Sequence, residues 1–176
     1  SADDLRKKAS QAYQDSRLYA PAGDNAMEYY LALRDKLPGD PGVSSALTDL
    51  LPMTVIATEQ SRDRGDFEEA QRLYALIEKA DKDHPSLPRL KSSVAAAEQA
   101  ETQRVEQQRL SAEQAAEEQA RLERERAAQQ EQQQREAAEQ LAAQQQAERE
   151  AAAEREAAQQ AAAEREAAQQ RAAQQR

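Results

Sequence analysis

Residues 151–160 read AAAEREAAQQ, and residues 161–170 repeat the same ten letters. The decamer has no apolar side chain larger than alanine, so it offers a hydrophobic core nothing to bury. Alanine, glutamate, glutamine and arginine are all within a few tenths of a kcal/mol of the best helix propensity. The repeat therefore predicts a helix that forms through its own backbone preference.

The same composition extends well upstream of the decamers. Between Glu98 and Arg176 there is no glycine, proline, aspartate, asparagine or aromatic residue. Over so many residues, helix preference can hold a helix without tertiary contacts. We expect one extended helix, roughly 130 Å long at 1.5 Å per residue if it begins near Leu90. A segment of this kind supplies length and offers no binding chemistry of its own.

Ion pairs are expected to support this helix unevenly. Opposite charges stand four residues apart in Glu117–Arg121, Arg121–Glu125, Glu131–Arg135 and Arg135–Glu139. Each such pair contributes about 0.2 to 0.5 kcal/mol. In the decamers, Arg155 and Arg165 stand directly beside glutamates, which face other directions on a helix. We therefore expect the C-terminal end to fray first.

Two alternatives to a single helix stay open. The larger aliphatic residues after Leu90 are too irregularly spaced for a heptad seam, being only Val94, Val105, Leu110, Leu122 and Leu141. Alanine stripes still allow weak self-association, although a ten-residue repeat turns about 80° around a 3.6-residue helix and so spirals away from a straight partner. Low-complexity, glutamine-rich sequence is also typical of disorder.

The two halves of the chain differ in what they can bury. All four glycines, all six prolines and all six aromatic residues of the 176-residue chain lie within its first 88 residues. We predict an all-α protein: a small head of antiparallel helical hairpins over residues 1–88, followed by an extended Ala/Gln/Glu/Arg-rich helical stalk over residues 89–176.

The first two head helices follow from apolar spacing and turn signals. Helical spacing from Leu5 to Tyr19 predicts a first helix, whose buried stripe includes Ala9, Ala12 and Tyr13. Asn25 and Glu28 form a capping pair that opens a second helix. We expect its buried face to consist of Ala26, Tyr30, Leu33 and Leu37.

Two further helices complete the predicted head. Asp40 as N-cap and Pro41 at the first position open the third, and Pro52 predicts either a kink or two short helices. Asp66 caps the fourth, which ends before His84. The third is expected to bury Val43, Ala46, Leu47, Leu50 and Leu51, and the fourth Phe67, Ala70, Tyr74, Ile77 and Ala80.

Composition excludes several classes of function. The formal charge is −9, which argues against nucleic-acid binding, since that binding depends on cationic side chains. There is no cysteine, hence no disulfide or thiolate metal site. No apolar run approaches the roughly 20 residues of a membrane span, so we expect no membrane contact by this segment. The start, SADDLRKK, lacks a methionine and a signal-peptide core, so we expect a piece of a longer protein.

The sequence also lacks the residue patterns of catalysis. The one histidine, His84, lies in the turn DKDHPSLP, where Asp81 and Asp83 are flexible neighbours and do not form a convergent ligand set. No serine or threonine has a histidine near it on a predicted face. We predict a protein that is not an enzyme, with no catalytic, cofactor-binding or metal-binding residues and no cofactor.

Two stretches resemble known repeat signatures. RGDFEEAQRLYALI, from Arg64 to Ile77, looks like a tetratricopeptide unit, and GDNAMEYYLAL, from Gly23 to Leu33, resembles the same signature. Ala26 and Ala70 are 44 residues apart, whereas that repeat has a period of about 34. The resemblance implies stacked antiparallel helix pairs without a regular superhelix.

The chain as a whole resembles an envelope protein family. The stalk, with EAAAEREAAQQ, resembles the periplasm-crossing helix of TolA-type proteins, although those use lysine where arginine stands here. Residues 5–91, including RLYAPAGDNAMEYYLALRDKLPGD and DFEEAQRLYALIEKAD, look like the periplasmic head of TonB-type energy transducers of xanthomonad-like bacteria.

The TonB-type resemblance implies a periplasmic connector in a protein anchored in the inner membrane by a segment outside this sequence. Its implied partners are inner-membrane motor proteins and outer-membrane transporters, reached through other parts of the molecule. Because neither the anchor nor a transporter-binding domain is present, no functional residue is transferred to a position here. The alternative is a tetratricopeptide-like protein–protein interaction adaptor with a helical or disordered tail.

Overall fold

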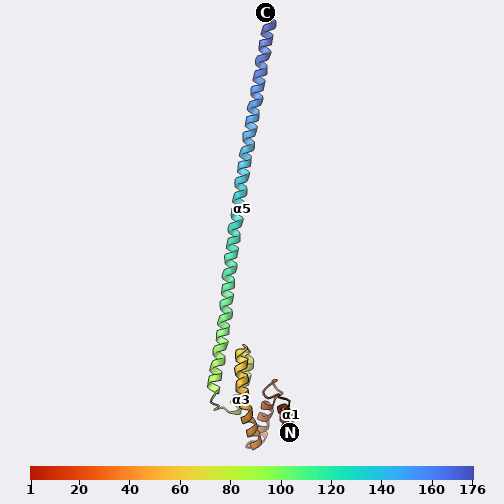
Figure 1. The fold of residues 1–176 in the computed structure, drawn as a ribbon, viewed down its shortest axis with the longest axis vertical. Coiled ribbons are helices and arrows are strands. Elements are labelled where there is room, and N and C mark those ends of the chain that lie inside the picture. The colour runs from red at the N-terminus through yellow and green to blue at the C-terminus, as the bar shows by residue number, and fades with distance from the viewer. The chain divides into compact units, whose positions relative to one another are not determined.

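The computed structural model describes residues 1–176 and is entirely helical (Figure 1). It has no strand, and its last helix is much longer than the others. The helices are α1 (Ala2–Gln14), α2 (Ala26–Lys36), α3 (Pro41–Asp63), α4 (Phe67–Ala80) and α5 (Leu87–Gln174). The all-α prediction and the long final helix are thereby confirmed.

Contacts divide the chain into two units, Ser1–Leu110 and Ser111–Arg176. The first unit contains α1 to α4 and the first part of α5, where Leu90 and Val94 are fully buried. The predicted boundary at residue 88 assigns Leu90 and Val94 to the stalk. This boundary stays a prediction.

The first helix is shorter than its apolar spacing predicts. Helix α1 ends at Gln14, and Ser16 has a φ of 60°, a left-handed conformation that no helix continues through. Ala9 and Ala12 are buried as expected, but Tyr13 is 43% exposed. Because the aspartate and serine at 15 and 16 favour local turns over helix, the expected continuation to Tyr19 is wrong.

Helix α2 confirms its predicted cap but presents a different face. The side chain of Asn25, itself fully buried, accepts a hydrogen bond from the Glu28 amide at 2.9 Å. Tyr30 and Leu37 are only partly buried, and the buried side chains are Ala26, Met27, Leu31 and Leu33. The face is set by packing against both α1 and α3, which one-sided spacing cannot reveal.

Helix α3 runs through its proline without a break. Asp40 accepts from the amides of Gly42 and Val43, and Pro41 occupies the first turn, as predicted. Pro52 lies inside the continuous helix, so the alternative of two short helices is wrong. Proline removes the amide that would bond to the Thr48 carbonyl. Because Pro52 and Thr48 are both exposed, a water molecule can donate to the Thr48 carbonyl in place of the missing amide.

Helix α4 follows a short turn and packs on α3. The Asp66 side chain accepts from the Glu69 amide at 3.2 Å, which confirms the predicted cap. Gly65 turns the chain with a φ of 78°. Ala70 and Ile77 are buried as expected. Leu73 is also buried, although it was not predicted to be. The predicted Phe67, Tyr74 and Ala80 are only partly buried.

The first turns of α5 close a second part of the core. Leu87 and Leu90 pack with Ile77 of α4, against partly buried Leu51, Val55 and Tyr74. A larger cluster has all its buried members in α1, α2 and α3, namely Ala12, Ala26, Met27, Leu31, Leu33, Val43, Leu47 and Leu50. Leu76 and Ala80 of α4 pack on its edge, and Leu51 packs against both clusters. The fold thus has two apolar clusters, and only the smaller one contains α5.

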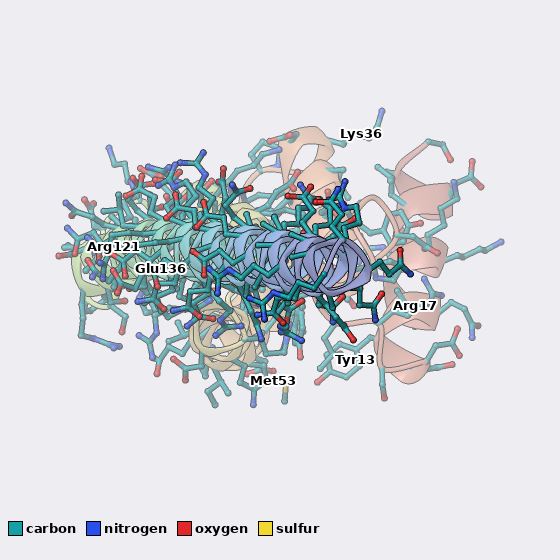
Figure 2. All side chains as sticks on the ribbon, turned by 90° about the horizontal axis from the view of Figure 1, so that it is seen from above. Tyr13, Arg17, Lys36, Met53, Arg121 and Glu136 are labelled. Atoms are coloured by element: carbon teal, nitrogen blue, oxygen red, sulfur yellow. The ribbon has the colours of Figure 1, made fainter.

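The second unit is helix and nothing else. Its side chains project all around the ribbon (Figure 2), and apart from the partly exposed Ala151 every one of them is exposed. Arg121 pairs with Glu118, where the sequence predicted Glu117, and with Glu125 at 2.7 Å. The predicted Glu131–Arg135 pair is present at 2.9 Å. Every cation of this unit is an arginine, since the last lysine is Lys91.

Candidate interaction surface

Two arginines, Arg72 and Arg34, link α4 to the part of the chain that contains α1 and α2. Near the beginning of α4, Arg72 bonds with Glu69 and donates to the Tyr19 carbonyl at 2.9 Å. Its Nη1 lies 3.9 Å from a Glu28 carboxylate oxygen and is buried without a hydrogen-bond partner. Arg72 therefore links α4 to the loop that connects α1 with α2.

Arg34 makes the matching contact at the end of α4. From the last turn of α2 it donates to the carbonyls of Ala80 at 2.8 Å and Lys79 at 2.7 Å. The last carbonyls of a helix lack intrahelical donors and carry its negative dipole end. One guanidinium therefore satisfies two of them and adds a favourable charge. Neither arginine stands out in the sequence, because each reaches a partner more than forty residues away.

The loop between α1 and α2 is held by a dense polar network. Glu28 accepts from the Gly23 amide at 2.6 Å and from the Asn25 side chain. Asp24 accepts from Arg17 at 2.5 Å and from the Tyr29 hydroxyl at 2.6 Å, and this bond raises the pKa of Tyr29 above its ordinary value. The loop is thereby fixed to α2, which explains how a segment without regular structure positions Tyr19 for Arg72.

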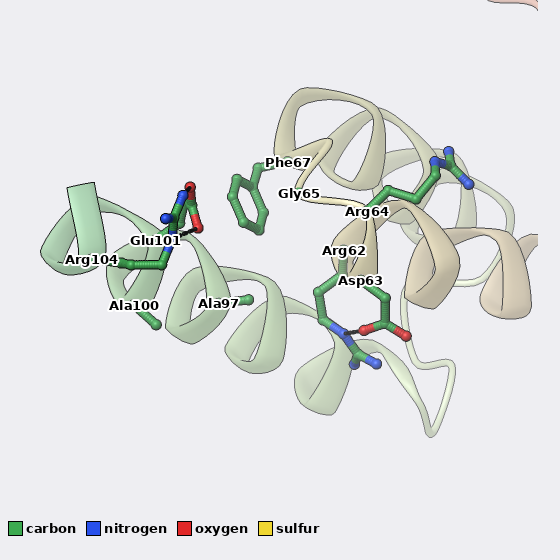
Figure 3. Close-up of a pocket in the computed structure, with 9 residues that line it drawn as sticks. All are labelled: Arg62, Asp63, Arg64, Gly65, Phe67, Ala97, Ala100, Glu101 and Arg104. Atoms are coloured by element: carbon green, nitrogen blue, oxygen red, sulfur yellow. Dashed lines mark hydrogen bonds and ion pairs between the residues drawn. The ribbon is translucent and has the colours of Figure 1, made fainter. Parts of the chain in front are cut away.

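A groove lies where the α3–α4 turn faces α5 (Figure 3). Its volume is about 530 Å³, and its walls are Arg62, Asp63, Arg64, Gly65, Phe67, Ala97, Ala100, Glu101 and Arg104. A second hollow of about 370 Å³ adjoins it on α5 and shares Phe67 and Glu101. Phe67 is thus the apolar centre of a surface with charged edges.

The charges around this groove are mostly paired among themselves. Arg62 bonds to Asp63 at 2.9 Å (Figure 3). It also donates to the Ser93 hydroxyl at 3.1 Å. Arg104 donates to Glu101 and lowers the pKa of that carboxyl. Arg64 contacts only a hydroxyl, donating to Ser61 at 3.2 Å. Phe67 is therefore the apolar group that the groove offers to a partner, while the Arg64 guanidinium points away from the ring (Figure 3).

Other large apolar side chains are exposed away from this groove. Met53 and Ile56 stand three residues apart on α3, with exposed fractions of 45% and 56%, and Tyr13 is exposed on α1 (Figure 2). Three-residue spacing puts Met53 and Ile56 on the same side of the helix. They form a small apolar patch on the exposed side of α3.

His84 has a structural role at the start of α5. Its Nδ1 accepts a hydrogen bond from the Ser86 amide at 3.1 Å, and its carbonyl accepts from the Leu87 amide. The side chain is partly buried. Nowhere in the chain do three or more histidine, aspartate or glutamate side chains converge as metal ligands would. The arrangement at His84 supports a turn that precedes a helix.

No helix combines the length and the apolar character that crossing a bilayer requires. No protein-family model, curated protein or solved structure matches this chain.

Proposed function

We propose that this chain is a non-enzymatic spacer and docking segment of a TonB-type energy transducer in the periplasm. In this proposal, a tetratricopeptide-like head of helical hairpins is followed by a stalk that carries the connection toward outer-membrane transporters. The inner-membrane motor proteins contact other parts of the molecule. The observation that supports the proposal best is the second unit, where an exposed helix continues to Gln174 without apolar contacts.

The length of this helix suits a spacer. Residues 111–174 alone extend about 95 Å at 1.5 Å per residue, about three times the hydrocarbon thickness of a bilayer. Side chains that need no partner can be repeated without creating an exposed apolar surface that promotes aggregation. Extension is therefore the property that this composition supplies.

The experiment changes length without changing helical phase. In the whole transducer, deletion of residues 131–166 removes about ten turns and roughly 54 Å while the remaining side chains keep their directions. The matched control scrambles the same residues at constant composition. We expect the deletion to abolish outer-membrane uptake and the scramble to preserve it. Equal uptake by the two variants would refute the spacer function.

The Phe67 groove favours a second candidate, an adaptor that binds a partner through the head. A partly exposed aromatic ring in a groove with charged walls is the kind of centre that carries interface energy. If this candidate is correct, Phe67→Ala abolishes partner capture, whereas Met53→Ala on α3 leaves it unchanged. The spacer function predicts little effect from either variant.

A further inference from the structure

We infer that the beginning of α5, residues 87–98, is a latch that releases from α3 and α4 before the rest of the first unit unfolds. The latch is defined by the contacts that these residues make with the two helices. Its buried side chains are Leu87, Leu90 and Val94. Its release exposes the apolar side chains of α3 and α4 that it covers.

The distribution of apolar contacts makes this release separable. The cluster that contains α5 has three buried members, Ile77, Leu87 and Leu90, whereas the cluster of α1, α2 and α3 has eight. No residue of α5 belongs to the larger cluster or packs on its edge. Detaching the latch therefore leaves the eight buried members of the larger cluster in place and, at the edge of that cluster, uncovers only Leu51, which packs against both clusters.

The polar contacts of the latch are weak and mostly exposed. Arg89 pairs with Glu59 at 3.3 Å, and Lys91 pairs with Glu78 at 2.8 Å. The side chains of Arg89 and Lys91 are both more than 40% exposed. Ser93 and Glu98 add single hydrogen bonds to Arg62 and Gln71. Exposed pairs contribute little to stability because water and salt screen them. Most of the attachment therefore depends on three aliphatic side chains.

Helix α5 does not need the latch contacts in order to stay helical. Its composition beyond Glu98 supports a helix by backbone preference, and the second unit is helical with all but one of its side chains exposed. Release consequently costs the buried contacts and spares the helical hydrogen bonds. In the envelope, release of the latch would limit the load that α5 passes to the first unit. This use rests on the proposed function, whereas the release itself does not.

The test uses buried thiols in the full chain, which has no native cysteine. Val94→Cys reports opening of the latch, and Val43→Cys reports opening of the larger cluster, since both valines are 1% exposed. Under conditions where closing outpaces labelling, we expect Val94→Cys to be labelled faster than Val43→Cys by a thiol reagent. Equal rates at the two positions would overturn the inference.

A second substitution separates the two openings. Leu33→Ala removes a side chain of the larger cluster, so it raises labelling of Val43→Cys by about a hundredfold and leaves Val94→Cys unchanged. Leu90→Ala raises labelling of Val94→Cys by a similar factor. If the first unit opens all at once, Leu33→Ala accelerates both thiols equally, which refutes the latch. The milder Leu33→Val gives the same comparison if Leu33→Ala fails to fold.

Discussion

Arg34 allows a direct test of how the first unit is held together. Arg34→Met keeps most of the aliphatic stem but removes both hydrogen bonds to the α4 carbonyls, which measure 2.8 and 2.7 Å. Hydrogen bonds from charged donors contribute about 1.5 to 3 kcal/mol each, and exposure of the Lys79 bond lowers its share. We expect a loss of about 2 to 3 kcal/mol in the free energy of unfolding.

The measurement can be confined to the first unit. All five tyrosines lie between positions 13 and 74 and there is no tryptophan, so tyrosine fluorescence during urea unfolding reports this unit and not the second. With a denaturant slope of about 1 to 3 kcal/mol/M, the expected loss lowers the midpoint by roughly 0.7 to 3 M. Arg34→Lys retains the charge but loses the planar, multiple-donor geometry of the guanidinium. Its unfolding midpoint should therefore lie between those of the wild-type chain and Arg34→Met.

Lys36 supplies the matched control. It lies two residues from Arg34 in the last turn of α2 and is exposed (Figure 2). Lys36→Met removes a charge from the same helix end without removing an interhelical bond. If Arg34→Met and Lys36→Met change the unfolding free energy by the same amount within about 0.5 kcal/mol, the proposed link between α2 and α4 is refuted.

Three further perturbations test local features. Gly65→Ala should cost about 1 kcal/mol by urea unfolding because its φ of 78° strains a residue with a Cβ, although that Cβ meets nothing within 4 Å; unchanged stability would contradict this strain. The hydrogen bond from Arg6 lowers the pKa of Asp40 below 3.8, so its stabilisation is complete above that value and is lost as the pH falls through the lowered pKa. Arg6→Met should therefore flatten the decline in stability below about pH 4, as tyrosine fluorescence against pH would show, and an identical acid profile would count against it. Ala152→Gly with Ala162→Gly should weaken the decamer helix by about 1 kcal/mol per site, seen as faster amide exchange in residues 151–170; unaltered exchange would mean that something other than backbone preference holds this segment.

Local signals in the sequence predicted the helix starts well. Asn25, Asp40 and Asp66 all cap the helices they were expected to cap, since capping involves only a few neighbouring residues. The long final helix followed equally from composition, because its stability requires no distant contact.

The buried faces were predicted less well. Met27, Leu31 and Leu73 are buried where Tyr30 and Tyr74 were expected, because a helix packed on two sides has no single apolar stripe. The contacts of Arg34 and Arg72 depend on how separate helices meet, and neither spacing nor composition encodes that meeting. The groove around Phe67 was missed for the same reason, since its walls come from the α3–α4 turn and from α5.

The charge of the second unit has a colloidal consequence. Residues 111–176 contain fourteen glutamates and nine arginines, and arginine keeps its proton at every pH that proteins tolerate. The segment therefore has five more anions than cations at neutral pH, so copies of it repel one another. Salt screens this repulsion, so clustering of these helices should increase with ionic strength and should reverse when the salt is diluted.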